Sequence, residues 1–161
     1  MARVWVVNAS PLILLGRIGR LDLLPRLCGR LVIPDAVARE VNQGCRGDPA
    51  RVWVRDTGHR FVSSPAPADP AVLMWGLGTG ETEVLSLCRA AVGREAIMDD
   101  GAARRCAIVL GIPVRGTLGL IVLAKRQGLI PAARPVVEEL TAKGLRAKPA
   151  VVELATRLAG E

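Results

Sequence analysis

The sequence predicts an α/β fold in which a central parallel β-sheet of about five strands carries helices on both faces. Short runs of β-branched residues alternate with longer segments of helical periodicity, which is typical of parallel strands joined by right-handed crossovers. The first run, residues 4–7, is apolar without interruption, as expected for a strand buried on both faces. The 161 residues, 50% of them hydrophobic, suffice for one core but not for two, so we predict one domain over residues 1–161.

The first half of the chain supplies two of the expected strands and several helices. After residues 4–7, Ser10 is predicted to cap a helix and Pro11 to occupy its first turn. A second helical piece, a second strand and a third helix are expected at residues 21–28, 31–33 and 34–41. Between residues 45 and 69 the periodicity weakens, and we expect a short strand at residues 60–62 before a Pro- and Ala-rich connector.

The second half alternates more regularly between the two kinds of element. Strands are expected at residues 96–98 and 113–115, and helices at residues 81–92, 101–110, 117–127, 132–143 and 149–159.

Composition limits the possible partners. The net charge of +7 and a sequence pI near 10.2 favour an anionic partner such as nucleic acid, an anionic membrane surface or an acidic protein. With one Phe, three Trp and no Tyr, a base-stacking platform for single strands is disfavoured. No apolar run is long enough to span a bilayer, and Asn8, Ser10 and Pro11 interrupt the first run before a signal-peptide core could form. We therefore expect a cytoplasmic protein that does not engage a membrane.

Several kinds of chemistry are disfavoured by the residues present. The four cysteines are far apart, without a CxxC pair, and His59 is the single histidine, so no zinc-ligand spacing exists and free thiols in a reducing cytosol are expected. His59 lies in the irregular segment and no serine lies in a nucleophile-elbow context, which disfavours a His-dependent triad. Gly78 and Gly80 alone support a nucleotide-binding loop, and the Lys-Ser/Thr ending of such a loop is missing.

Acidic residues are the remaining candidates for chemistry. Glu81 shares a helix face with Val84 and Leu85, so it is turned toward the protein body, where a carboxylate is costly unless it is paired or coordinated. Glu83 is instead interpreted as an N-terminal charge that complements the helix dipole. By its position alone, Glu40 resembles a solvated surface residue on the helix from residue 34.

Polar residues also follow two of the expected strands. Asp99 and Asp100 come directly after residues 96–98, and Asn8 follows residues 4–7. Adjacent carboxylates repel one another unless a cation neutralises them, although Asp100 also suits a helix cap. Because the carboxyl ends of parallel strands meet at one edge of a sheet, these side chains are expected to gather there. Oxygen ligands of this kind suit Mg²⁺ or Mn²⁺.

Ordered blocks along nearly the whole chain resemble PIN-domain proteins. The opening blocks are residues 6–13 (VVNASPLI) and residues 32–37 (VIPDAV) followed by Glu40. The later blocks, at residues 78–83 (GTGETE), 97–104 (IMDDGAAR) and 116–119 (GTLG), resemble an uncharacterised PIN subfamily related to the VapC-type toxins of toxin–antitoxin pairs. The resemblance implies a PIN-like fold with a five-stranded parallel sheet and endoribonuclease activity dependent on Mg²⁺ or Mn²⁺.

The resemblance also implies a site. Its metal ligands would be Asn8, Glu40, Glu81, Asp99 and Asp100, and its catalytic residues the same four acids. We favour Asp100 over Asp99 as the last acid. PIN nucleases usually carry Asp at the position of Asn8, and since Asn brings an oxygen but no charge, metal affinity and activity are predicted to be lower.

Two functions remain open on this basis. The first is a metal-dependent ribonuclease that cuts RNA phosphodiesters as the toxin of a toxin–antitoxin pair, with an antitoxin protein as partner. The alternative is a catalytically weak or inactive PIN-fold protein that binds RNA or a protein without cutting. The resemblance further implies a homodimer. Arg104, Arg105, Lys125 and Arg126 are candidate phosphate contacts.

Overall fold

The computed structural model describes residues 3–161, which contain a four-stranded parallel sheet in the order β2-β1-β3-β4. The central strand β1 (Val4–Val7) pairs with β2 (Arg30–Val32) on one side and with β3 (Arg94–Ile97) on the other. The short strand β4 (Val114–Arg115) completes the sheet beside β3. The buried side chains of β1 confirm the prediction of an apolar central strand.

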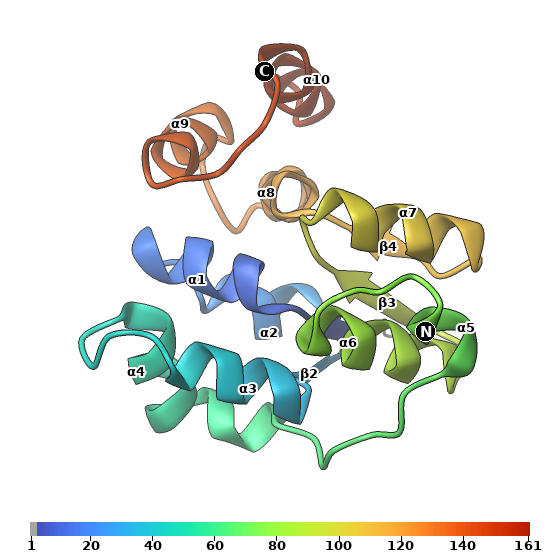
Figure 1. Ribbon diagram of the computed structural model, residues 1–161. Coiled ribbons are helices and arrows are strands. Elements are labelled where there is room, and N and C mark those ends of the chain that lie inside the picture. The colour runs from blue at the N-terminus through green and yellow to red at the C-terminus, as the bar shows by residue number, and fades with distance from the viewer. Residues whose placement is uncertain (1–2) are drawn as a thin grey trace.

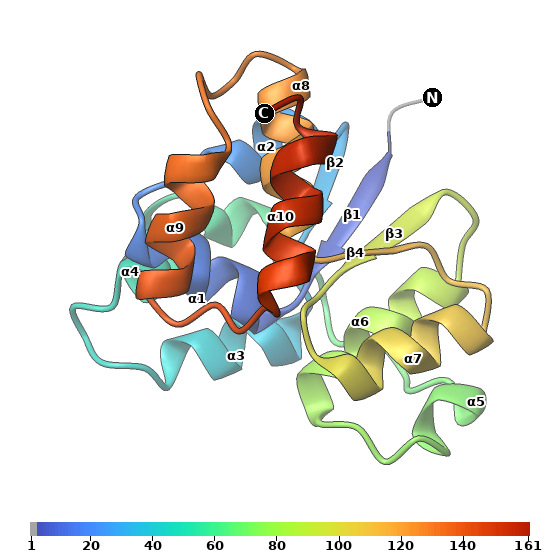
Figure 2. The same ribbon diagram turned by 90° about the horizontal axis from the view of Figure 1, so that it is seen from above.

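Helices cover both faces of the sheet, as predicted. Figures 1 and 2 both show α6 and α7 side by side on one flank, with α1, α2 and α8 on the other. Helix α10 packs on α8, and no helix within residues 3–161 is both long and apolar enough to cross a membrane. The α-helices are α1 (Ala9–Arg17), α2 (Leu23–Leu27), α3 (Asp35–Asn42), α4 (Pro49–Asp56), α5 (Pro70–Leu73), α6 (Thr79–Arg89), α7 (Gly101–Val109), α8 (Thr117–Arg126), α9 (Arg134–Ala142) and α10 (Pro149–Leu158).

The predicted count of about five strands is wrong by one within the described residues. The segment expected to be a strand at residues 60–62 begins with a 3₁₀ helix, η1 (Gly58–Phe61), and only Val62 forms a single parallel bridge with Ile33. Phe61 stacks on Trp53 of α4, with the ring centroids 6.2 Å apart, which favours the compact turn over an extended strand. Further pairing stops because the prolines that follow, at positions 65 and 67, have no N–H to donate.

The starts of two helices also differ from the prediction, and one further helix was not predicted. Helix α1 begins at Ala9 with Asn8 as its N-cap, so Ser10 lies inside the first turn and does not cap the helix. Helix α6 begins at Thr79, two residues earlier than expected. Helix α4 was not predicted, because the weak periodicity of residues 45–69 hid a good start signal, in which Asp48 caps the helix.

Candidate active site

The carboxyl ends of β1 and β3 meet where the chain changes direction across the sheet. From β1 the chain crosses to β2 on one side, whereas from β3 it crosses to β4 on the other, and ligand sites in open α/β sheets form at such a point. Asn8 follows β1 directly, and its backbone N–H donates to the carbonyl oxygen of Ile97 over 2.9 Å. Asp99 and Asp100 follow the same end of β3.

A cavity of about 340 Å³ lies at this point and is lined by every predicted site residue. The two strand ends supply Asn8, Asp99 and Asp100, α3 supplies Glu40, and α6 supplies Glu81. The loop between α9 and α10 closes another wall with residues 144–146. Side chains 92 positions apart in the sequence therefore border one space because the strands are parallel and adjacent.

Asn8 is the most buried member of this set, with 2% of its surface exposed. Its Nδ2 donates to Glu81 Oε1 over 3.3 Å, but its Oδ1 is buried without any hydrogen-bond donor. A Cβ built on Gly80 would lie 3.2 Å from Asn8 Oδ1 and 2.9 Å from Glu40 Oε2. Both oxygens thus border the same small space, and a glycine in α6 keeps that space open.

Glu40 and Glu81 repel one another, and the acids of the cavity form no ion pair within the described residues. Partial burial, and after it the negative charge of Glu81, raise the pKa of Glu40 above its ordinary value. None of the ion pairs formed within residues 3–161 involves Glu40, Glu81, Asp99 or Asp100. A cation between Glu40 and Glu81 would relieve this repulsion.

Asp99 and Asp100 have different surroundings. Thr117 holds Asp99, because its backbone N–H donates to Oδ1 over 2.8 Å and its hydroxyl donates to Oδ2 over 2.6 Å. Ser10 adds a longer bond of 3.4 Å to Oδ2. Asp100 is exposed and caps α7 by accepting from Ala103 N over 2.9 Å, which confirms the predicted cap. Asp99 is therefore the fixed carboxylate of the doublet, whereas the sequence favoured Asp100.

The donor set fits a hard cation in part. Asn8, Glu40 and Glu81 each have side-chain oxygen atoms and line the cavity, and oxygen ligands suit Mg²⁺ or Mn²⁺. Asn8 Oδ1, buried and without a donor, is the kind of atom that a metal ion would satisfy. Within residues 3–161, however, no three His, Cys, Asp or Glu side chains are grouped closely enough to hold a metal. A cation here would rest on two carboxylates and one amide oxygen.

Sequence reasoning missed the residues that support the acids. Thr117 and Ser10, which hold Asp99, lie in blocks of the PIN resemblance without an assigned role. Arg146 lines the cavity but comes from a loop whose place no local pattern reveals. Of the predicted phosphate contacts, Lys125 and Arg126 donate to the carbonyl oxygens of residues 131 and 158, so both hold the C-terminal segment in place.

The interpretation of Glu83 as a charge at the helix N-terminus is wrong. Because α6 begins at Thr79, the acid of its first turn is Glu81. Glu83 is buried, with 7% of its surface exposed, and it accepts hydrogen bonds from the backbone N–H groups of Ala36 and Ala66.

Comparison with known proteins identifies the family. The family model DUF3368, described as a PIN domain, matches residues 4–161. The chain belongs to this PIN-domain family. No curated protein matches the sequence. PIN domains are generally nucleases, so membership supports a hydrolase that acts on nucleic acid. The parallel sheet of this PIN domain, with helices on both faces, agrees with that family.

Proposed function

We propose that this PIN domain is an endoribonuclease dependent on Mg²⁺ or Mn²⁺ and that it is the toxin of a toxin–antitoxin pair. One observation carries the proposal: Asn8 Oδ1 is buried without a donor and borders the same space as Glu40 Oε2. Such an atom is costly unless something satisfies it, and a divalent cation would do so. The resemblance to VapC-type toxins supports RNA as the substrate.

Each residue then has a role that its surroundings allow. Asn8, Glu40 and Glu81 would hold the cation, which when bound lowers the pKa of water and neutralises phosphate charge. Thr117 keeps Asp99 fixed at the wall of the cavity. Asp100 uses only Oδ2 for its helix cap, so its Oδ1 can accept a proton from the attacking water.

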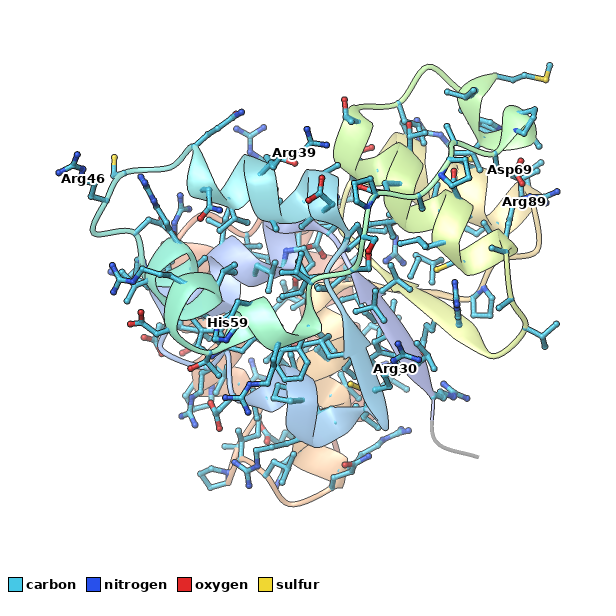
Figure 3. The ribbon with its side chains drawn as sticks, turned by 90° about the horizontal axis from the view of Figure 1, so that it is seen from below. Arg30, Arg39, Arg46, His59, Asp69 and Arg89 are labelled. Carbon is cyan, nitrogen blue, oxygen red and sulfur yellow. The ribbon has the colours of Figure 1, made fainter. Side chains whose placement is uncertain are left out.

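Cations flank the acids on two sides and suit an RNA backbone. Arg146 lines the acidic cavity, and Arg39 lines an adjoining cavity of about 460 Å³ that also contains Glu40 and Glu81. Figure 3 shows Arg39 on α3, and 67% of its side chain is exposed beside its partner Asp35. Phosphates on either side of the scissile bond can therefore meet a guanidinium. RNA binding should weaken steeply with salt, because neutralised phosphates release counterions.

Mn²⁺ titration by calorimetry and cleavage of a mixed RNA test the proposal together. We expect wild-type protein to bind one Mn²⁺ and to cut RNA, and Glu81→Gln to lose both. The matched control is Glu138→Gln, which changes an exposed glutamate of α9 and should retain both. The ribonuclease proposal fails if Glu81→Gln and wild type bind and cut alike.

The second candidate is a PIN domain that binds RNA without cutting it. The amide at Asn8 favours it, as does the lack of three grouped acidic, His or Cys ligands in residues 3–161. It predicts RNA binding that depends on Arg39 and Arg146 but is indifferent to Mn²⁺ and to Glu81→Gln. The same calorimetry, combined with a binding assay on uncleaved RNA, separates the two functions.

For the proposed antitoxin, the surface that fits best is a groove of about 810 Å³ between α8 and α10. Val151, Leu154 and Leu158 of α10 are each about half exposed there. Lys148 also lines the groove, as does Arg146, which lies at the end that adjoins the acidic cavity. Apolar walls with a cationic end complement an amphipathic helix that carries acidic residues. RNA lacks the aliphatic face to match such walls.

A test of the groove uses Leu154→Asp with the proposed antitoxin, an acidic protein that would be encoded beside this chain. Gel filtration should reveal a complex with wild type that Leu154→Asp abolishes, while Mn²⁺ binding is retained. If Leu154→Asp binds the partner equally well, the groove is not its site. The homodimer is part of the same proposal, and light scattering of the isolated chain checks it. A dimer that Leu154→Asp converts to monomer would assign the groove to a second copy.

A further inference from the structure

Glu83 is a buried carboxylate for which the proposed chemistry has no use. Its Oε2 accepts from Ala36 N over 2.7 Å, and its Oε1 accepts from Ala66 N over 2.9 Å. None of the ion pairs within residues 3–161 involves it. A buried charge without a cation persists only if hydrogen bonds satisfy its oxygens, and here two backbone N–H groups do so.

One of these two bonds, the one from Ala36, joins the two helices that carry Glu40 and Glu81, whereas the bond from Ala66 ties α6 to the connector that precedes α5. Ala36 lies in the first turn of α3, where Pro34 provides no side-chain cap, so Glu83 caps α3 from α6. Glu40 follows Ala36 by one helical turn, and Glu81 precedes Glu83 by two residues. The hydrogen bond between Ala36 and Glu83 therefore joins the two helices close in sequence to Glu40 on α3 and to Glu81 on α6.

The two acids oppose that approach. Glu40 and Glu81 are both negative and border one cavity, and the charge of Glu81 contributes to the raised pKa of Glu40. Gly80 lets α3 and α6 come close because it lacks a side chain, but it does not attract α3. The hydrogen bond between Glu83 and the backbone N–H of Ala36 at the start of α3 is such an attraction.

We propose that Glu83 is a positioning residue that holds α3 and α6 at the spacing at which Glu40 and Glu81 can share one cation. That Glu40 and Glu81 share a cation rests on the proposed function. The effect of Glu83 on the spacing of α3 and α6 can be tested in metal-free protein. Glu83 touches neither substrate nor cation in this assignment, and its whole effect passes through α3 and α6.

The same face of α6 provides a matched control. Ser86, one turn after Glu83, is 4% exposed, and its hydroxyl accepts from Asp69 N over 2.8 Å. Arg89 pairs with Asp69 over 3.0 Å, and Figure 3 shows the two side chains together at the surface. Ser86 thus binds the same connector as Glu83 but makes no hydrogen bond to α3. Ser86→Ala removes a buried bond without touching the proposed tie.

The test compares Glu83→Gln with Ser86→Ala by two measurements. The first is the ¹H–¹⁵N resonance of the Asn8 side-chain amide in metal-free protein, because that amide donates to Glu81. The second is the Mn²⁺ dissociation constant from calorimetry. A Gln presents an NH₂ group to one of the two backbone donors, so one bond is lost. We expect the Asn8 resonance to move and Mn²⁺ binding to weaken about tenfold in Glu83→Gln, with neither change in Ser86→Ala.

Each outcome decides the question. An unmoved Asn8 resonance in Glu83→Gln, or the same movement in Ser86→Ala, overturns the positioning role. If wild type binds no Mn²⁺, the proposed function fails, while the Asn8 resonance still tests the spacing. Should Glu83→Gln not fold, Glu83→Asp replaces it, because the shorter carboxylate keeps the charge but cannot reach both donors, and the same shift of Asn8 is expected.

Discussion

Acids lie near both ends of strands β1 and β3, but their surroundings at the two ends differ. Near the amino ends, Glu95 is 5% exposed and accepts from Trp5 Nε1 over 2.9 Å and from Arg115 Nε over 3.0 Å, with Arg3 at 3.4 Å. At the carboxyl ends, Glu40, Glu81 and Asp99 line one cavity, and none of them forms an ion pair with any of residues 3–161. One end of the sheet thus has an ion-paired acid, and the other has a cluster of acids that form no ion pair within the described residues.

The presence of ion pairs at one end and their absence at the other distinguishes an acid that stabilises the fold from acids that are free to bind a ligand. The chain has 22 Lys and Arg residues, so counter-charges are abundant, yet none of the ion pairs formed within residues 3–161 involves Glu40, Glu81 or Asp99. Acids that lie close together without ion pairs, in a chain that is rich in Lys and Arg, are candidates for function. Asn8 moderates their repulsion, because it places a neutral side chain among them and donates to Glu81. The expected consequence is a more stable metal-free protein with weaker metal binding.

The largest expected effect comes from the acid near the amino ends. Glu95→Ala leaves Arg115 without its partner and the indole N–H of Trp5 without an acceptor, so it should lower the free energy of unfolding by about 3 kcal/mol. Glu81→Gln removes an acid without a counter-charge and should cost nothing measurable. Urea unfolding of both variants checks this. Equal losses of stability would erase the distinction between the two ends.

Local patterns predicted the parts of the fold that depend on local chemistry. The apolar run of β1, the parallel alternation and the cap at Asp100 are all visible in neighbouring residues. The strand expected at residues 60–62 was wrong because a contact between Trp53 and Phe61 shapes that segment, and such contacts leave no periodic signal. The start of α6 was misplaced because Gly78 and Gly80 are both plausible N-caps.

The candidate site was accessible to sequence reasoning only in its strand-end members and through the family resemblance. Glu40 resembles a surface residue until α3 is placed beside α6, and Glu83 resembles a dipole charge until Ala36 is placed against it. Thr117 binds Asp99 only because β4 lies beside β3. These pairings follow from the order of strands, which single-sequence periodicity does not contain.

The second largest expected effect comes from adding a negative charge at the carboxyl end of β1, which increases the difference between the two ends of the sheet. Asn8→Asp should tighten Mn²⁺ binding about ten- to thirtyfold, equivalent to about 1–2 kcal/mol, because a carboxylate beside Glu40 and Glu81 attracts the dication. It should also destabilise the metal-free protein, since the donor to Glu81 is lost and repulsion grows. Calorimetry with Mn²⁺ and thermal unfolding with and without the metal measure both. Unchanged affinity would contradict a cation site at Asn8.

A smaller effect should separate stability from binding within one substitution. Gly80→Ala lies in α6, where alanine is favoured over glycine by about 0.5–1 kcal/mol. Its new Cβ would lie 2.9 Å from Glu40 Oε2, and because that carboxylate is the end of a flexible side chain, it can move aside. We therefore expect a protein at least as stable as wild type that binds Mn²⁺ several-fold more weakly. A variant that keeps both properties would show that the space beside Gly80 is not used.

The smallest effect concerns the pH dependence of Glu40. Its pKa in the folded protein is raised above the ordinary value of 4.5, by burial first and by Glu81 second. Ionisation of Glu40 therefore opposes folding, a cost that is absent below the unfolded pKa, grows as pH rises toward the folded pKa, and is constant above it. Relative to Glu40→Gln, wild type should thus lose stability as pH rises above the ordinary pKa of 4.5 and through the raised pKa of the folded protein. Since Glu40 is largely exposed, solvent screening limits the loss to a few tenths of a kcal/mol. Urea unfolding at several pH values measures this loss.

Saturating Mn²⁺ should reverse the stability difference between the two proteins at neutral pH. Wild type should then be more stable than Glu40→Gln, because only wild type keeps the Glu40 carboxylate for the cation. A gap between the two proteins that is constant with pH would mean that Glu40 does not feel the charge of Glu81.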